Sequence, residues 1–205
     1  MHLEALTDAG ARLLPALSKF EGYYLAGGTA LALQIGHRVS VDFDFFSGDD
    51  IPASMHTKVR RVFPSALFSP LVNDASELTV SIDGVKITFL KYPFPVIEPF
   101  VEYAGLKLLS VREIAATKAY TIGRRGALKD YVDLYFVLAK KHATLAEIIA
   151  LAKKKFGAEF NSRLFLEQII FLDDIEEVEV DFLLEPVRRI QLVAFFQECV
   201  RGISL

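Results

Sequence analysis

The chain has 205 residues, of which 52% are hydrophobic and 24% charged, and its net charge is −3. With a mean hydropathy of +0.33, the composition excludes a disordered chain, which would carry too few apolar residues to form a core. The net charge also excludes a surface that is positively charged throughout and would bind nucleic acid in that way. The single cysteine, Cys199, excludes intrachain disulfide bonds. We expect one compact domain, or one domain with a small helical appendage.

Export and membrane signals are not evident in the sequence. Residues 1–10 do not have the form of a signal peptide, and no uninterrupted apolar run reaches the ~18–20 residues needed to cross a bilayer. The sequence therefore predicts a cytoplasmic protein with no membrane partner.

The first expected elements are a helix, a short strand and a second helix. Apolar residues recur near helical spacing over residues 3–20, and Pro15 should kink or split this helix. A strand over residues 22–26 then runs into a pair of glycines. Thr29 is expected to cap the next helix, over residues 30–35.

Residues 39–46 alternate in polarity, which is the period-two pattern of a strand with two different faces. One face would be apolar and the other would hold a hydroxyl and two carboxylates: Val41, Phe43 and Phe45 against Ser40, Asp42 and Asp44. The two carboxylates are therefore expected on the same side of the strand.

A helix and a β-hairpin follow. The helix opens at residues 51–52 and closes near Pro64. Two runs of strand-forming residues, 77–82 and 85–91, flank the two-residue turn 83–84. This spacing predicts an antiparallel pair of strands.

The second half of the chain reads as almost entirely helical. An extended piece over residues 100–108 precedes a capping box, in which Ser110 and Glu113 satisfy each other's backbone donors at the start of a helix through about residue 122. A turn over residues 123–126 follows. Four further helical stretches are expected over residues 128–141, 144–156, 160–172 and 182–201.

These elements predict an α+β fold. A small mixed β-sheet with packed helices would occupy residues 1–104, and a helical region packed on this core would occupy residues 105–205. The boundary follows from composition, because short strands punctuated by Gly, Asp and Pro give way to helices with few breakers.

Two glycines followed by two carboxylates form the most informative pattern in the chain. Gly27 and Gly28 precede a helix, and the electropositive start of a helix attracts phosphate through its backbone N–H groups. Asp42 and Asp44 lie at i and i+2 on a strand, so both can face one divalent cation such as Mg²⁺. The pattern favours a site for a metal and a polyphosphate.

Each half of this pattern also has an ordinary structural interpretation. Taken alone, two glycines more often form a simple turn, and Asp-Phe-Asp on a strand more often forms a solvated sheet face. Their conjunction favours a site, because one helical connection separates them and both can converge at one end of a sheet.

Residues 25–33, LAGGTALAL, and residues 36–46, GHRVSVDFDFF, are similar to a known pair of motifs. They resemble the AbiEii/AbiGii-type nucleotidyltransferases, the toxin components of abortive-infection systems, within the DNA polymerase β-like nucleotidyltransferase superfamily. A second block also resembles this family: Lys118, Arg125 and the run KDYVDLY from residue 129.

The resemblance implies an activity and its cofactor. Gly27, Gly28 and Thr29 match the turn that holds a triphosphate. Asp42 and Asp44 match the metal-binding acids, which take Mg²⁺ or Mn²⁺. The implied reaction moves a nucleotidyl group from a nucleoside triphosphate to an acceptor hydroxyl, with RNA as the implied acceptor and an antitoxin protein as the implied partner.

The resemblance also assigns charged residues outside the first motif. These are catalytic or nucleotide-binding candidates: Lys118, Lys129, Asp130, Asp133, Arg125 and Arg38. Segment 107–141 holds eight Lys and Arg against three Asp and Glu, and a local cationic surface suits phosphate binding. Simpler interpretations stay open: Lys129 and Asp133 fit a surface ion pair at i and i+4, and both arginines fit structural roles.

The third carboxylate of the superfamily is not evident. It would lie on a neighbouring strand, but residues 85–91 carry no acid and Thr88 takes the inward position. Four acids elsewhere are unsupported candidates: Asp74, Glu77, Asp83 and Glu98. The alternative function is therefore a catalytically degenerate module that binds a nucleotide or a partner on the same fold.

Overall fold

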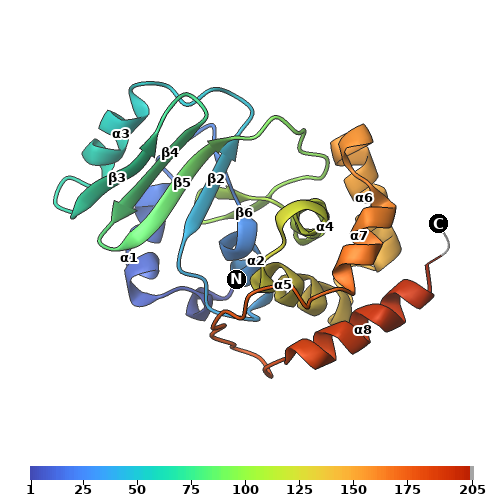
Figure 1. Cartoon of the computed structure of the whole chain (residues 1–205). Helices are drawn as coiled ribbons and strands as arrows, with labels where there is room; N and C mark the ends of the chain where they lie inside the picture. The colour runs from blue at the N-terminus through green and yellow to red at the C-terminus, as the bar shows by residue number, and fades with distance from the viewer. Residues whose placement is uncertain (204–205) are drawn as a thin grey trace. The chain divides into compact units, whose positions relative to one another are not determined.

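The computed structural model describes residues 1–203, with the exception of the side chain of Arg125 (Figure 1). Its internal contacts divide the chain into two compact units. The sheet unit comprises residues 1–95 and 99–109, and the helical unit comprises residues 96–98 and 110–205. No helix among residues 1–203 combines the length and the apolar character needed to cross a bilayer.

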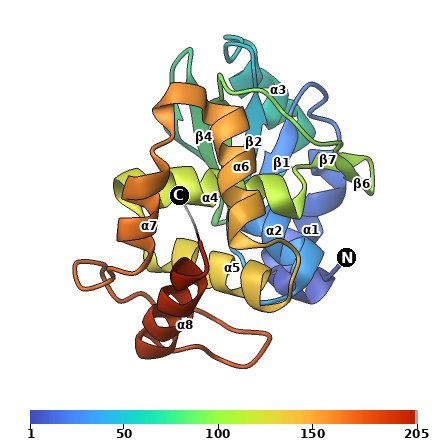
Figure 2. The same cartoon turned by 90° about the vertical axis from the view of Figure 1, so that its right-hand side faces the viewer.

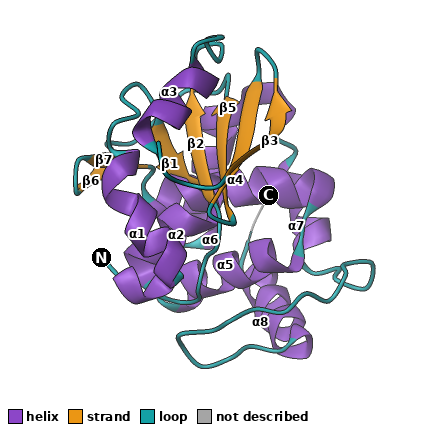
Figure 3. Ribbon diagram, turned by 90° about the vertical axis from the view of Figure 1, so that its left-hand side faces the viewer, coloured by secondary structure: helices purple, strands orange, loops and turns teal. Residues whose placement is uncertain are grey.

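The sheet unit is built on seven strands in the order β3-β4-β5-β2-β1-β7-β6 (Figure 3). In chain order they are β1 (Tyr24–Ala26), β2 (Phe43–Ser47), β3 (Phe68–Asn73), β4 (Glu77–Ile82), β5 (Val85–Lys91), β6 (Val101–Tyr103) and β7 (Leu106–Leu108). Strand β2 runs parallel to β5 and β1 runs parallel to β7, whereas the other pairs are antiparallel. The sheet is therefore mixed, as predicted.

Short helices complete the sheet unit. They are η1 (Leu3–Ala5), α1 (Asp8–Leu17), α2 (Gly27–Ile35) and α3 (Met55–Val62). Thr7 caps α1 by accepting a hydrogen bond from the backbone of Gly10, and Gly36 ends α2 at a φ of +62°. A left-handed residue at the end of a helix is most easily supplied by glycine.

One face of the sheet forms the core of this unit. The side chains of Phe43 and Phe45 on β2 and of Phe89 on β5 are at most 1% exposed. Gly10 of α1 lies against the ring of Phe43, and Phe20 packs on Phe89 with ring centroids 4.8 Å apart. Because strand side chains alternate, the residues between these phenylalanines point to the opposite face.

The helical unit contains α4 (Val111–Arg125), α5 (Leu128–Ala139), α6 (Leu145–Phe156), η2 (Gly157–Glu159), α7 (Ser162–Ile169) and α8 (Arg189–Arg201). Helix α4 packs against α5, α6 and α7, and α8 packs against α5 and α7 (Figure 2). Small side chains permit this close packing, because Ala115, Ala116 and Ala119 of α4 are fully buried. Helix α4 is thus the centre of the unit.

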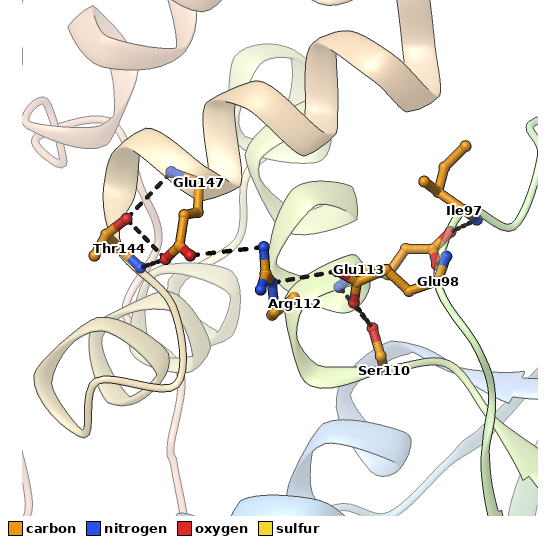
Figure 4. Close-up of polar contacts among 7 residues, drawn as sticks. All are labelled: Ile97, Glu98, Ser110, Arg112, Glu113, Thr144 and Glu147. Carbon is orange, nitrogen blue, oxygen red and sulfur yellow. Dashed lines mark hydrogen bonds and ion pairs between the residues drawn. The ribbon is translucent and has the colours of Figure 1, made fainter.

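Glu113 ties residues 96–98 into the helical unit (Figure 4). Its carboxylate accepts hydrogen bonds from the backbone N–H groups of Ile97 at 3.0 Å and Glu98 at 2.9 Å. It also pairs with Lys155 Nζ at 2.6 Å, and both side chains are fully buried. The predicted capping box is therefore half right: Ser110 caps the backbone of Glu113, but the Glu113 carboxylate serves a buried cation and another segment.

Three other sequence-based predictions of elements were wrong. Helix α2 begins at Gly27, so Thr29 lies inside its first turn and does not cap it. Helix α4 continues to Arg125, so most of the predicted turn at residues 123–126 is helical. The last helix begins at Arg189 rather than near residue 182, because Pro186 lacks the N–H that a helix interior requires.

Candidate functional site

The backbone bends sharply where β1 meets α2. Gly27 has a φ of +65°, in the region that glycine adopts without steric cost. A Cβ at this position would lie 2.7 Å from Asp44 Oδ2. The pairing of Ala26 with Asp44 across β1 and β2 brings this carboxylate to the bend. Gly27 is therefore needed both for the conformation and for the approach of Asp44.

The start of α2 lies beside this carboxylate. The N-cap of the helix is the extended Ala26, whose side chain makes no capping hydrogen bond. The first four N–H groups of a helix have no partner inside it. Gly28 adds no side chain over the first turn, so this end of α2 is suited to an anion such as phosphate.

Asp42 and Asp44 lie on the side of the sheet opposite the buried phenylalanines. In β2 the burial alternates, with Phe43 and Phe45 inside and Asp44 half-exposed. Asp42 immediately precedes the strand, and its Oδ2 lies 3.1 Å from Lys86 Nζ. The hydrogen bond to Asp42 raises the pKa of Lys86, burial opposes this, and the charges of Asp42 and Asp44 add to the rise. One ammonium thus interacts with both acids.

The side chain of Thr29 makes hydrogen bonds to the segment that carries the acid pair. Its side chain is buried and its hydroxyl contacts Ser40 Oγ at 2.7 Å and the carbonyl oxygen of Asp42. The hydroxyl of Thr29 is thus engaged with the backbone of Asp42, and contact of Thr29 with a triphosphate stays a prediction. Its position links the first turn of α2 to the start of β2.

A row of polar side chains continues from Asp44 across the sheet. Thr88 on β5 is directly opposite Asp44, as the sequence indicated, and Thr79 on β4 is opposite Thr88. Thr79 Oγ1 donates to Glu77 Oε1 at 2.6 Å and lies 3.2 Å from Thr88 Oγ1. Glu77 is therefore on the same face as the acid pair, three strands away from β1.

The other candidates for a third acid have different partners. Asp74 accepts from the backbone of Ser76 and Glu77 in the turn before β4. Asp83 accepts from the backbone of Leu67. Glu98 belongs to the helical unit, where it pairs with Arg112 and accepts from Ser110. Among residues 1–203 with described placement, no group of three or more His, Cys, Asp or Glu is arranged to hold a metal ion.

A second cluster lies in the helical unit, around Lys118 of α4. Its Nζ is 2.6 Å from Asp130 Oδ1 and 2.7 Å from Asp133 Oδ2, both on α5. Asp133 is fully buried, and Asp130 also accepts from the backbone of Ala127 at the start of α5. Burial acts to lower the pKa of Lys118, but the charges of Asp133 and Asp130 outweigh it and raise this pKa.

The remaining predicted residues have varied surroundings. Lys129 is half-buried, and in the part of the chain that the structure describes it has no ion pair with Asp133, which pairs with Lys118. Arg38 is 4% exposed and donates to the carbonyl oxygen of Val39. The side chain of Arg125 lies outside the described residues.

Two features of the site could not be found from sequence. Lys86 was not singled out, although its place two residues before Thr88 puts it on the same face of a strand. The pairing of Lys118 with Asp130 and Asp133 depends on how α4 packs on α5, and no spacing in the sequence reports that packing.

Comparisons with known proteins show similarity at the level of family and fold. The family model described as nucleotidyl transferase AbiEii toxin, type IV toxin–antitoxin system, matches residues 11–64 and 49–205. An uncharacterised protein of Aquifex aeolicus, aq_aa25, is 32% identical over 157 residues, which cover 76% of this chain and 76% of that protein.

Solved structures share the fold. MenT4, described as a nucleotidyltransferase toxin of Mycobacterium tuberculosis H37Rv, has a TM-score of 0.63 at 17% identity and matches 94% of this chain and 81% of its own. JHP933 from Helicobacter pylori has a TM-score of 0.55 at 17% identity, with 96% and 94% coverage. These likenesses confirm the predicted fold class, and the family match confirms the resemblance seen in the motifs. The chain belongs to the AbiEii family of nucleotidyltransferase toxins.

Proposed function

We propose that this chain is a divalent-metal-dependent nucleotidyltransferase, which moves a nucleotidyl group from a nucleoside triphosphate to an acceptor hydroxyl and releases pyrophosphate. The observation that carries the proposal is the approach of Asp44 Oδ2 to Gly27, at 2.7 Å from where a Cβ would be. This approach supports the proposal that the acid pair and the start of α2 form one site for a metal and a polyphosphate in the sheet unit.

Asp42 and Asp44 would hold Mg²⁺ or Mn²⁺. Two carboxylates on one face fit the donor set of Mg²⁺, which usually takes one or two carboxylates and completes its shell with substrate phosphates and water. The bound ion would lower the pKa of the attacking hydroxyl and neutralise charge on the leaving pyrophosphate. The chain itself orients the pair, because Thr29 fixes the carbonyl group of Asp42.

The remaining residues would bind phosphate and orient the acceptor. Gly27 and Gly28 would bind the polyphosphate through backbone N–H groups at the start of α2. Lys118 and Lys129 would stabilise phosphate charge. Asp130 would position Lys118, with which it pairs at 2.6 Å, or accept the acceptor's proton.

Arg38, Arg125 and Asp133 complete the proposed nucleotide contacts. Arg38 and Arg125 would add positive charge for the phosphates. Asp133 would act through Lys118, because its carboxylate is fully buried and pairs with that ammonium. An antitoxin protein is the proposed partner, by analogy with the toxin–antitoxin role in the description of the family. RNA is the proposed acceptor, as the resemblance of the motifs implies.

A catalytically degenerate nucleotide-binding or partner-binding module is the second candidate function. Two observations on the described residues favour it. No cluster of three metal-binding side chains is present among them, and Thr88 takes the place opposite Asp44 where a third acid would be. Without that acid, a nucleotide could bind and yet not react.

Release of pyrophosphate decides between the two functions. The purified protein would be incubated with each nucleoside triphosphate, Mg²⁺ or Mn²⁺, and total RNA. We expect release, and we expect Asp44→Asn to slow it by about 10²–10³-fold, because a metal ligand supplies several kcal/mol to the transition state. Asp49→Asn is the matched control, since Asp49 is an exposed acid just beyond β2.

Calorimetry with the same triphosphates completes the test. Binding of a nucleotide without release of pyrophosphate under every condition would replace the proposal with the second candidate. The toxin role has its own test, in which induced expression arrests growth and Asp44→Asn restores it. Healthy growth on expression of the wild-type chain would count against that role.

A further inference from the structure

Lys86 lies at the acid pair although no motif in the sequence marks it. Its Nζ is 3.1 Å from Asp42 Oδ2, and its side chain is 47% exposed. It precedes Ile87 of β5, which pairs with Phe43 of β2, so Lys86 lies beside Asp42, the residue just before β2. The ammonium group therefore reaches the acid pair from the neighbouring strand.

Carboxylates at β2 and on β4 interact electrostatically with the ammonium group of Lys86. The hydrogen bond to Asp42 raises the pKa of Lys86, burial opposes the rise, and the charges of Asp42, Asp44 and Glu77 add to it. Carboxylates this close repel each other unless a positive charge lies between or beside them. Lys86 supplies such a charge from within the protein.

We propose that Lys86 is a resident counter-ion of the acid pair, which a divalent cation displaces and which then pairs with the bound polyphosphate. This inference rests on the proposed function, because it requires Asp42 and Asp44 to be the metal ligands. It makes Lys86 a positioning residue: it holds the Asp42 carboxylate in place before a cation arrives.

Displacement is compatible with the surroundings of Lys86. A lysine has a flexible four-carbon stem and a compact charge, so the ammonium can move while the strand stays in register. The ion pair is half-exposed, and such pairs are weak. A divalent cation that takes over Asp42 Oδ2 would also repel the ammonium, and a polyphosphate bound to that cation would attract it.

The proposal predicts opposite effects on two ligands. With no phosphate present, Lys86 competes with the cation and weakens its binding. With a polyphosphate present, the displaced ammonium adds a favourable contact and strengthens binding. A residue that only supported the strand would not change the two affinities in opposite directions.

The test uses Lys86→Met and two simple probes. Mn²⁺ alone, titrated by electron paramagnetic resonance, should bind the variant about 3- to 10-fold more tightly than the wild type. Inorganic tripolyphosphate with Mg²⁺, titrated by calorimetry, should bind it about 3- to 10-fold more weakly. Lys86→Arg, which keeps the charge, should stay near the wild type in both titrations.

Lys91→Met is the matched control. Lys91 lies on the same strand, is 40% exposed and pairs with Asp50 at 2.6 Å, so the variant also loses one surface ion pair on β5. Equal Mn²⁺ affinity in the Lys86→Met, Lys91→Met and wild-type proteins, with binding lost in Asp42→Asn, would overturn the role of Lys86 and leave the metal site intact. Absence of Mn²⁺ binding in all of them would overturn the metal site itself.

Discussion

Gly27 is the residue at which the backbone bend and the acid pair meet. Replacing it by alanine should lower the free energy of unfolding by about 1–2 kcal/mol, because a left-handed conformation is strained for any residue with a Cβ. The new Cβ would also displace the Asp44 carboxylate, which lies 2.7 Å from its position. Urea denaturation measures the first effect, and loss of the Mn²⁺-induced rise in melting temperature measures the second.

Gly22→Ala is the control that separates backbone strain from contact with the Asp44 carboxylate. Gly22 has a φ of +88°, and nothing lies within 4 Å of the position that its Cβ would take. This variant should lose a similar amount of stability but keep its response to Mn²⁺. If Gly27→Ala also kept the full response, the close approach of Asp44 would not matter for cation binding.

Single residues also mark the limit of what the sequence could predict about the site. The acid pair was predicted from the alternation in residues 39–46, although β2 begins only at Phe43 and Asp42 lies just before it. Lys86 was not predicted, although residues 85–91 were the candidate neighbouring strand, because its contact with Asp42 depends on the register between β5 and β2. The sequence offered Lys129, on the same helix, as an ion-pair partner of Asp133. In the structure the buried carboxylate of Asp133 pairs with Lys118 of α4.

At the scale of elements, the buried pair of Glu113 and Lys155 joins α4 to α6. Replacing Glu113 by glutamine should lower the free energy of unfolding by about 3–5 kcal/mol, because it leaves a buried lysine without its counter-charge. The amides of Ile97 and Glu98 lose the carboxylate that accepts from them. Their hydrogen exchange should therefore become faster, which nuclear magnetic resonance would detect.

Glu167→Gln provides the comparison for that variant. Glu167 pairs with Arg163 one turn away on α7, and both side chains are largely exposed, so its loss should change stability by no more than about 0.5 kcal/mol. A loss for Glu113→Gln as small as this would mean that the buried pair contributes little to the helical unit.

A second prediction for the helices concerns Tyr131 of α5. Its ring is fully buried, and its hydroxyl donates to the carbonyl oxygen of Gln168 at 3.2 Å. Burial raises the pKa of Tyr131 to about 12. Between pH 10 and 12 the unfolded chain would release this proton while the folded chain keeps it, so the free energy of unfolding should fall as pH rises through this window.

Tyr131→Phe removes this dependence. The decline between pH 10 and 12 should be shallower in the variant by about 1–2 kcal/mol, as measured by denaturant unfolding at several pH values. At pH 8 the two proteins should differ by a constant amount that reflects the lost hydrogen bond. Parallel curves across the whole range would show that the phenol group ionises normally in the folded state.

The elements that were predicted well from the sequence are those whose formation depends on residues close together in the chain. The hairpin of β4 and β5 has the predicted bounds, because Asp83 and Gly84 adopt the positive φ angles of a tight turn. Strand β3 was missed, since this edge strand contains Pro70 and most of its side chains are exposed. Its pairing with β4 is a contact between segments, which local pattern does not encode.

At the scale of the whole molecule, charge is unevenly distributed. Residues 173–185 contain seven acids and no base, so the rest of the chain carries a net charge of +4. Within the helical unit, Val178 and Val180 of this acidic segment line a cavity with Leu128 and Val132 of α5. The segment therefore lies beside the helix that carries Lys129, and its field opposes the cationic character of segment 107–141.

We predict that this acidic segment weakens binding of RNA, the proposed acceptor. Four of its acids would be replaced by their amides, which raises the net charge from −3 to +1: Asp173, Glu176, Glu179 and Asp181. Affinity for total RNA should rise several-fold at low salt, because phosphate binding follows local charge. The gain should shrink as salt rises toward physiological strength, where the Debye length is about 8 Å.

A variant of equal net charge shows whether location matters. It would replace four exposed acids elsewhere by amides: Glu21, Glu102, Glu167 and Glu198. A larger gain for the segment variant than for this scattered variant would mean that the acids beside α5 oppose RNA there, since both proteins have the same total charge. Equal gains would attribute the effect to net charge alone, and no gain in either variant at low salt would argue against a polyanionic acceptor.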